Sequence, residues 1–269
     1  MVRTARIILR DNWAWRGRIW HLAFTELQKE VRGSVLSWVW LLVTPAVYIG
    51  GFWFALSIGM RTASPVAGVP YIVWISVGIV PWFFISSLLT GGANVYRRYS
   101  YLVNRLRFPL SVISSFFGLA QLIVFAASML LVLALTLAMG VKLTLPAVQV
   151  PVIALLMYAF WVTWSVFTAP LAAISKDIYN LIKALSILVF WFSGTIFDVS
   201  HITIRWIRWL LAFNPITFFV TAFREAICRG VWLWDDPRLL WPFAVVFALL
   251  ILLALKAQDR LSAEVPDVL

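Results

Sequence analysis

Long stretches without a charged side chain dominate this sequence. Six of them are separated by charged residues, at 33–60, 62–96, 108–141, 143–175, 184–197 and 239–255. A helix needs about 20 apolar residues to cross the roughly 30 Å hydrocarbon core of a bilayer. Only 12% of the 269 residues are charged and 63% are hydrophobic, a balance that is foreign to soluble domains. The sequence therefore predicts an all-α integral membrane protein with almost no soluble part.

These stretches predict six transmembrane helices. Four are longer than a span needs, and the last suffices if Arg238 and Lys256 extend toward the membrane surface. The stretch 184–197 is too short, because a helix of that length rises only about 21 Å. We expect its span to begin earlier and to end at Asp198. The predicted spans are 36–59, 71–93, 110–138, 148–174, 178–197 and 239–255.

Lysine and arginine orient the spans. The N-terminal segment and the second and fourth connections are basic, whereas the first and third connections contain only Arg61 and Lys142. Positive charge collects on the cytoplasmic side, so both termini are predicted to be cytoplasmic. The net charge of +11 comes from basic residues that cluster beside the apolar spans, a pattern typical of topology signals and of contact with anionic lipids. No nucleic-acid partner is expected.

Residues 1–34 are predicted to form a cytoplasmic amphipathic interface segment of two helices, followed by the transmembrane domain, 35–269. Asp11-Asn12 is expected to provide the turn and cap between the two helices. The second helix has an apolar stripe flanked by basic residues, typical of a helix on the membrane surface. It is either a simple anchor or a moving element beside a gate. The stripe consists of Trp13, Trp20, Phe24, Leu27 and Val31.

The segment 198–238 carries five arginines on the predicted outer side, where positive charge is usually scarce. We expect two short re-entrant helices there, 202–212 and 215–229, that shape an exit. Asn214 is expected to cap the second helix, with Pro215 at its first position. Arg224 either faces the exit or only pairs with Glu225 or a helix end. The expected outer-gate residues are Arg205, Arg208, Asn214, Thr217, Thr221 and Arg224.

The sequence shows none of the residue constellations that common catalytic sites need. It contains no G-x-x-x-x-G-K-[ST] motif, so no ATP binding through a P-loop is expected. His21 and His201 are predicted on opposite sides of the membrane, and no metal site is expected. No acidic residue lies between Glu30 and Asp177, although enzymes acting on lipid phosphates or glycosyl donors normally need acids or metal ligands. We expect a transport permease rather than an enzyme.

A series of short motifs lies along the chain between about residues 22 and 256. They are Arg32-Gly33-Ser34-Val35-Leu36, Trp40, Pro45, Gly78, Pro81-Trp82-Phe83-Phe84, Asn94, Leu102-Val103, Arg107-Phe108-Pro109, Lys176-Asp177, Asn180, Ser193, Asn214-Pro215 and Phe223-Arg224. In this order the chain resembles the ABC-2-type permease family, in particular the membrane subunits that export lipid-linked polysaccharides such as O-antigen or teichoic acid.

The resemblance implies a homodimer in the bacterial cytoplasmic membrane, with a canal between the first and fifth spans. Two separate ATPase subunits would bind ATP and Mg²⁺, and this chain would bind no cofactor. The cargo would be an undecaprenyl-linked glycan. The ATPases would dock on the basic connection 94–109 and on the turn 175–180. From charge alone, the basic residues of 94–109 could equally be the positive charge that any cytoplasmic connection carries. The expected coupling residues are Tyr96, Arg97, Arg98, Arg105, Phe108, Asp177 and Asn180.

The sixteen tryptophans have two interpretations. Most are expected in the aromatic belts at the membrane surfaces. The alternative is that some line the canal and stack on sugar rings, and the candidates are Trp40, Trp53, Trp74, Trp82 and Trp191. Two other functions remain open: an ABC-2 exporter of small lipids or drugs, and a non-transport membrane subunit or enzyme of glycan assembly.

Overall fold

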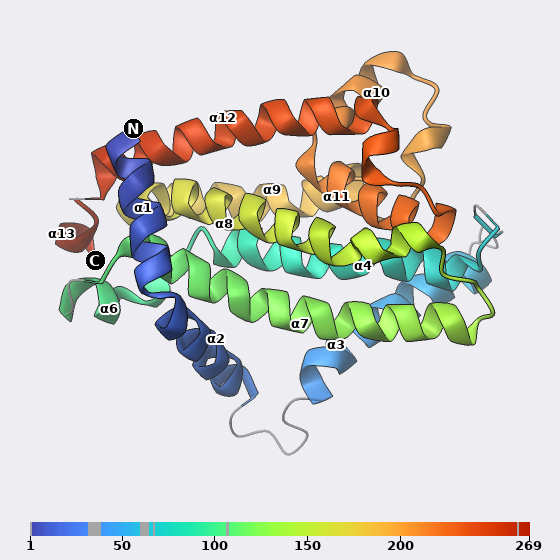
Figure 1. Ribbon diagram of the computed structural model, residues 1–269, viewed down its shortest axis with the longest axis horizontal. Helices are drawn as coiled ribbons and strands as arrows, with labels where there is room; N and C mark the ends of the chain where they lie inside the picture. Colours follow the sequence, from blue (N-terminus) through green and yellow to red (C-terminus); the bar gives the residue numbers. More distant parts are fainter. Residues whose placement is uncertain (1, 32–38, 60–64, 67, 106–107, 263) are drawn as a thin grey trace.

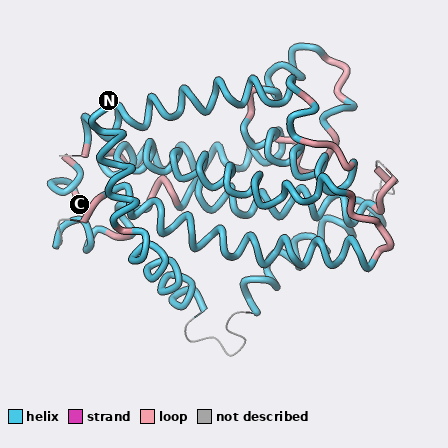
Figure 2. The backbone as a smooth tube through the Cα atoms, in the orientation of Figure 1, coloured by secondary structure: helices cyan, strands magenta, loops and turns pink. Residues whose placement is uncertain are grey.

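The computed structural model describes residues 2–31, 39–59, 65–66, 68–105, 108–262 and 264–269 (Figure 1). Within these ranges the chain is helical and forms no strand (Figure 2). Extended pairing is limited there to an isolated bridge between Val66 and Val69. The predicted all-α class is confirmed.

Four long apolar helices form the body of the molecule. In the described part of the chain, these four are long and apolar enough to cross a membrane. Three of them closely match predicted spans, and the fourth continues past the apolar stretch into 256–261. They are α4 (Tyr71–Ser86) with the π-helical η3 (Ser87–Gly91), α7 (Leu110–Ala138), η4 (Leu145–Gln149) with α8 (Val150–Ile174), and α12 (Pro237–Leu261).

The other two predicted spans are shorter. The first corresponds to α3 (Trp40–Trp53) and the π-helical η2 (Phe54–Gly59), and its residues 36–38 lie outside the described ranges. The fifth corresponds to α9 (Lys176–Phe192). A fifth crossing is obtained if the bent pair α10 (Arg205–Ala212) and α11 with η6 (Pro215–Arg229) counts as one span, but its halves meet at 89°. Six spans therefore remain a proposal.

The predicted span 178–197 ends too late. Helix α9 stops at Phe192, and Gly194 takes a left-handed conformation with φ of +71°. Such a residue closes a helix, and glycine adopts it without steric cost. The Ser193 hydroxyl also donates back to the Val189 carbonyl. The apolar sequence continues to Phe197, but as a turn rather than a helix.

The predicted break at Asp11-Asn12 is also wrong. Helix α1 (Val2–Ala14) runs through both residues, and α2 (Arg16–Val31) begins after Trp15. Asn12 does not cap a helix, because its amide is used elsewhere. Its Nδ2 donates to the Ile8 carbonyl at 2.9 Å, and its Oδ1 accepts from the Ser115 hydroxyl of α7 at 2.6 Å.

The core lies where these helices meet. Helix α8 packs against α7 and α12, and α4 packs against α7 and α11. Both termini lie at one end of the bundle, here called the terminal end, together with α6 and α13 (Figure 1). Helix α10 lies at the opposite, distal end. The shorter elements are α5 (Val95–Arg98), α6 (Ser100–Arg105), η5 (Val199–His201), α11 (Pro215–Arg224), η6 (Glu225–Arg229), η7 (Leu233–Asp235) and α13 (Val265–Val268).

Candidate functional site

At the terminal end, Arg97 joins the first predicted docking element, 94–109, to the end of α8. Its Nε donates to the Ala172 carbonyl at 2.8 Å, and its Nη2 donates to the Ala173 carbonyl at 2.6 Å. These carbonyls belong to the last turn of α8, whose orphan acceptors need donors. The turn 175–180 follows directly. Arg97 therefore fixes the connection 94–109 to the end of α8, directly before the second docking element, and is itself half-buried.

Glu26 ties the interface helix α2 to the same connection. It is only 2% exposed, and it forms an ion pair with Arg98 and a longer one, 3.8 Å, with Lys29. A buried carboxylate needs such partners. Burial, and then the neighbouring Glu26, raise the pKa of Tyr99. Sequence reasoning did not single out Glu26, and its only signal was one acid on an otherwise apolar helix face.

The amphipathic stripe of α2 divides in two. Leu27 is buried, and so are Ile19 and Ala23, because α2 packs against α7. By contrast, Trp20 is 57% exposed and Phe24 is 46% exposed, and Trp13, which belongs to α1 rather than α2, is 72% exposed. Helix α2 thus has one face on the bundle and an apolar side left for the membrane surface.

The predicted coupling residues separate by exposure. Tyr96 is fully buried, so it supports the connection from inside. Phe108 is half-buried and packs edge-on against Trp15, with ring centroids 4.7 Å apart. The side chain of Arg105 lies outside the described part of the structure. The residues open to a partner are Arg98, Asp177 and Asn180.

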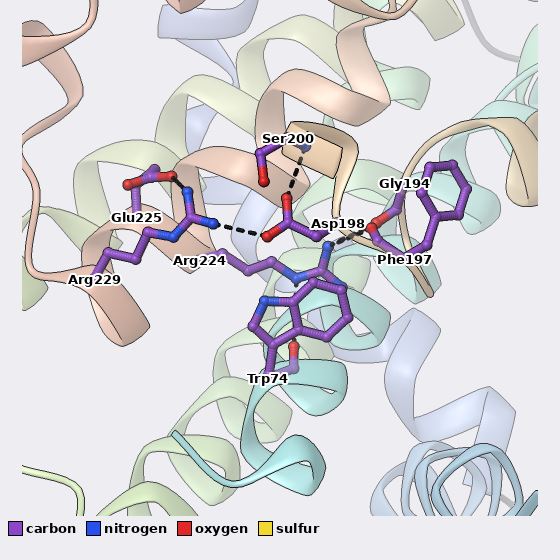
Figure 3. A network of polar contacts seen from close by, with 8 residues as sticks. All are labelled: Trp74, Gly194, Phe197, Asp198, Ser200, Arg224, Glu225 and Arg229. Carbon is purple, nitrogen blue, oxygen red and sulfur yellow. Dashed lines mark hydrogen bonds and ion pairs between the residues drawn. The ribbon is translucent and has the colours of Figure 1, made fainter. Parts of the chain in front are cut away.

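At the distal end, Arg224 of α11 is buried inside one chain (Figure 3). Its Nη1 donates to the Gly194 carbonyl at 2.6 Å, and its Nη2 donates to the Thr195 carbonyl at 2.5 Å. The guanidinium carbon lies 3.4 Å from the centre of the Trp74 ring. A buried arginine is tolerated when oxygen atoms accept its N–H groups and an aromatic face lies against its charge. Arg224 therefore holds the turn after α9 against α4, and it is not open to a cargo in this conformation.

A second polar group lies beside this one. Arg229 bridges Asp198 at 2.7 Å and Glu225 at 2.6 Å, and the Asp198 carboxylate accepts the Ser200 backbone N–H at 2.9 Å (Figure 3). Burial opposes ionisation of Asp198, but the Ser200 hydrogen bonds and the Arg229 charge hold its pKa below the usual range. The link ties η6 to the segment that follows α9.

The local capping predicted for the second outer helix is confirmed. The Asn214 Oδ1 accepts the Ile216 N–H at 3.0 Å, and Pro215 occupies the first helical position. Gly230 ends the following π-helical turn at φ of +68°. The first outer helix begins at Arg205 rather than at 202, because η5 and an extended segment precede it.

A cavity of about 580 Å³ opens between α10, α11 and the start of α12. It brings four of the predicted gate residues together, and they are Arg205, Arg208, Thr217 and Thr221. Asn214 and Arg224 do not line it. The predicted gate thus divides into a cavity and a buried clamp.

The tryptophan candidates for a canal also divide. Trp74 is 2% exposed and its face is covered by Arg224, so we no longer expect it to face a canal. Trp82 is half-buried against Phe190, with ring centroids 5.0 Å apart. Trp53 is half-buried as well. Trp40 is 48% exposed beside a groove between α3, α4 and α7, and Trp191 is 52% exposed.

The sequence of this chain matches a known family of membrane transporters. The family described as ABC-2 type transporter matches residues 17–228, so the chain belongs to that family. It is also similar to the O-antigen export system permease protein RfbA of Myxococcus xanthus, with 26% identity over 81% of this chain and 82% of that protein. The protein of the same name from Klebsiella pneumoniae is 20% identical over 77% of this chain and 78% of its own length.

Proposed function

We propose that this chain is the permease subunit of an ABC exporter that moves a lipid-linked cell-surface polysaccharide across the bacterial cytoplasmic membrane. The observation that carries the proposal is the similarity to O-antigen export permeases over about four fifths of both chains. The sequence supports it further, because it contains no P-loop motif of its own. ATP and Mg²⁺ would belong to a separate ATPase subunit, and this chain would make or break no bond.

The docking surface for that ATPase would lie at the terminal end. The exposed residues Arg98, Asp177 and Asn180 are available for contact, and the Arg97 bonds fix the element that carries Arg98 to the end of α8, which runs directly into the element that carries the other two. An ATPase movement applied to either element would therefore reach both α8 and α9. This arrangement supports both termini and both docking elements lying in the cytoplasm, as the positive charges predict.

The cargo path would form between two copies of the chain, at α3 and α9. No residue of α9 is buried within the described structure, and its apolar side chains remain exposed. They include Leu181, Leu185, Leu188, Trp191 and Phe192. An apolar face of this extent supports burial against a second copy or lipid. Trp40 and Trp191 would then lie near an undecaprenyl-linked glycan.

Co-purification tests the proposal first. The full chain, tagged and extracted from its native membrane, should bring down a P-loop ATPase in equal amount. Membrane vesicles containing both proteins should then show ATP-dependent movement of a lipid-linked glycan to the opposite leaflet. A chain that is stable and active alone, with no ATPase bound, would contradict the exporter. ATP-driven export of small lipids or drugs without glycan movement would contradict the cargo.

A further inference from the structure

We propose that the distal cavity between α10, α11 and α12 binds the phosphate headgroup of an anionic membrane amphiphile. Its volume is about 580 Å³, which lies in the range of sites for small molecules. This inference concerns a site within one chain and does not depend on the proposed polysaccharide cargo.

Cations without carboxylate partners line the cavity. Arg229 is neutralised by Asp198 and Glu225. In the part of the chain that the structure describes, Arg205 and Arg238 form no ion pair, although both line the cavity. Arg208 also lines it, and its Nε and Nη2 donate to the Ile202 carbonyl at 3.2 and 2.7 Å.

The charge balance of the lining is therefore positive. Beyond the group formed by Arg229 and its two acids, the lining offers three arginines and one carboxylate, Asp236. The Asp236 Oδ1 already accepts the Arg238 backbone N–H at 3.0 Å. Guanidinium groups bind phosphate oxygens through paired hydrogen bonds. An anion with several oxygen acceptors matches this lining better than a cation or a neutral sugar.

An unused hydroxyl lies in the wall of the cavity. Thr217 of α11 lines it and is 4% exposed, yet its Oγ1 has no hydrogen-bond partner among the described residues. Buried hydroxyls are normally hydrogen-bonded, because an unpaired one loses its contact with water without gaining another partner. A ligand with oxygen atoms would supply the missing partner. This second observation is independent of the arginines.

The rest of the wall is apolar and belongs to the membrane boundary. Trp209 and Trp241 contact each other across α10 and α12, with ring centroids 6.0 Å apart, and both line the cavity. On α10, Trp206 is 68% exposed and Leu210 is 65% exposed. Tryptophan and arginine together mark helices that lie at the headgroup level. The ligand should therefore carry an apolar chain as well as a phosphate.

Two sources supply this chemistry: a bulk anionic phospholipid and a polyprenyl diphosphate lipid. The test measures binding of each to the purified full chain by native mass spectrometry, with phosphatidylglycerol and undecaprenyl diphosphate as probes and phosphatidylcholine as the zwitterionic reference. The variants are Arg205→Gln with Arg238→Gln, and Thr217→Val, which removes only the hydroxyl. The matched control is Arg260→Gln, an exposed arginine at the other end of α12.

We expect phosphatidylglycerol to bind more tightly than phosphatidylcholine. The double arginine variant should weaken binding by about tenfold or more, since each arginine near anionic lipid contributes about 1 kcal/mol, a factor of roughly five. Thr217→Val should weaken it about threefold, and Arg260→Gln should leave it unchanged. Retention of undecaprenyl diphosphate alone, with the same sensitivity to the variants, would support the phosphate site and assign its source.

Two results would overturn the inference. One is equal binding of both anionic probes to the wild-type chain and the double arginine variant. The other is an equal loss in the Arg260→Gln control, which would show that general surface charge holds the lipid.

Discussion

Gly78 in α4 leaves the space that the guanidinium of Arg224 fills. A Cβ atom at Gly78 would overlap Arg224 Nη2 and lie 2.7 Å from the Thr195 carbonyl oxygen. One missing side chain in α4 therefore admits a charged group from α11 and the backbone of the turn after α9. Three segments that are distant in sequence meet there, and Arg224 supplies the hydrogen bonds that join them.

Gly78→Ala should destabilise the protein. The added methyl group cannot be accommodated without moving Arg224 or the turn, and such overpacking costs about 1–3 kcal/mol. The thermal midpoint in detergent, followed by size-exclusion chromatography after heating, should fall. Gly51→Ala in α3 is the matched control, because its Cβ would meet nothing within 4 Å. An equal midpoint for the two variants would contradict the close packing around Arg224.

Arg224→Lys should destabilise nearly as much as Arg224→Ala. Lysine keeps the charge but cannot hold the Gly194 and Thr195 carbonyls at once while lying flat on Trp74. We expect a loss on the order of 2 kcal/mol for each, because buried carbonyls lose their donors. The same thermal assay measures it, with Arg205→Ala on exposed α10 as control. A midpoint that Lys restores fully would show that charge alone matters at this site.

Glu26→Gln should loosen α2 from the bundle. The neutral amide keeps the shape but leaves Arg98 without its charged partner, so that α2 is held to the connection 94–109 less firmly. Hydrogen exchange of the α2 amides should become faster by about five- to tenfold, equivalent to roughly 1 kcal/mol. Lys29→Gln, which removes only the longer and exposed contact, should change exchange little. Equal exchange in the wild type and both variants would show that packing against α7, without the ion pair, is enough to hold α2.

The Asp198–Arg229 link should resist acid. Because the pKa of Asp198 is lowered in the folded protein, the stability it contributes is fully present above its ordinary value of 3.8 and is lost only as pH falls below it. Asp198→Asn should therefore lower the thermal midpoint by a constant amount between pH 8 and about pH 5. The gap to wild type should close only at lower pH. A gap that closes near pH 6 would contradict the lowered pKa.

The bounds of a helix could be predicted from the sequence where the length of an uncharged stretch alone determined them. Residues 110–138 form a helix with the predicted bounds because an uncharged run of that length leaves the backbone no other way to satisfy its hydrogen bonds in lipid. The end of α9 was not predictable from hydrophobicity, since Phe197 is as apolar as the span before it. The left-handed Gly194 closes the helix locally, and the Arg224 bonds that hold the following turn depend on tertiary structure.

The candidate sites were predictable only in part. Arg224 stood out as a charge in an apolar helix, but its partners are backbone carbonyls, and any residue type could have supplied those. Gly78 was recognised as part of a motif without its reason, which is the space for Arg224. Glu26 was overlooked, because an acid within a basic surface helix resembles an ordinary solvated charge until Arg98 is brought next to it.

Asp177→Ala should uncouple the ATPase while leaving the permease folded. Asp177 is exposed in the first turn of α9 and forms no hydrogen bond or ion pair with the other described residues, so its loss should change the thermal midpoint by less than about 0.5 kcal/mol. Its carboxylate is free to pair with an arginine of the partner. We expect ATP hydrolysis by the purified complex to fall, or the ATPase to dissociate. Asp267→Ala, an exposed acid in α13 at the same end of the bundle, should do neither. If both variants keep full hydrolysis and binding, the turn 175–180 is not a docking element.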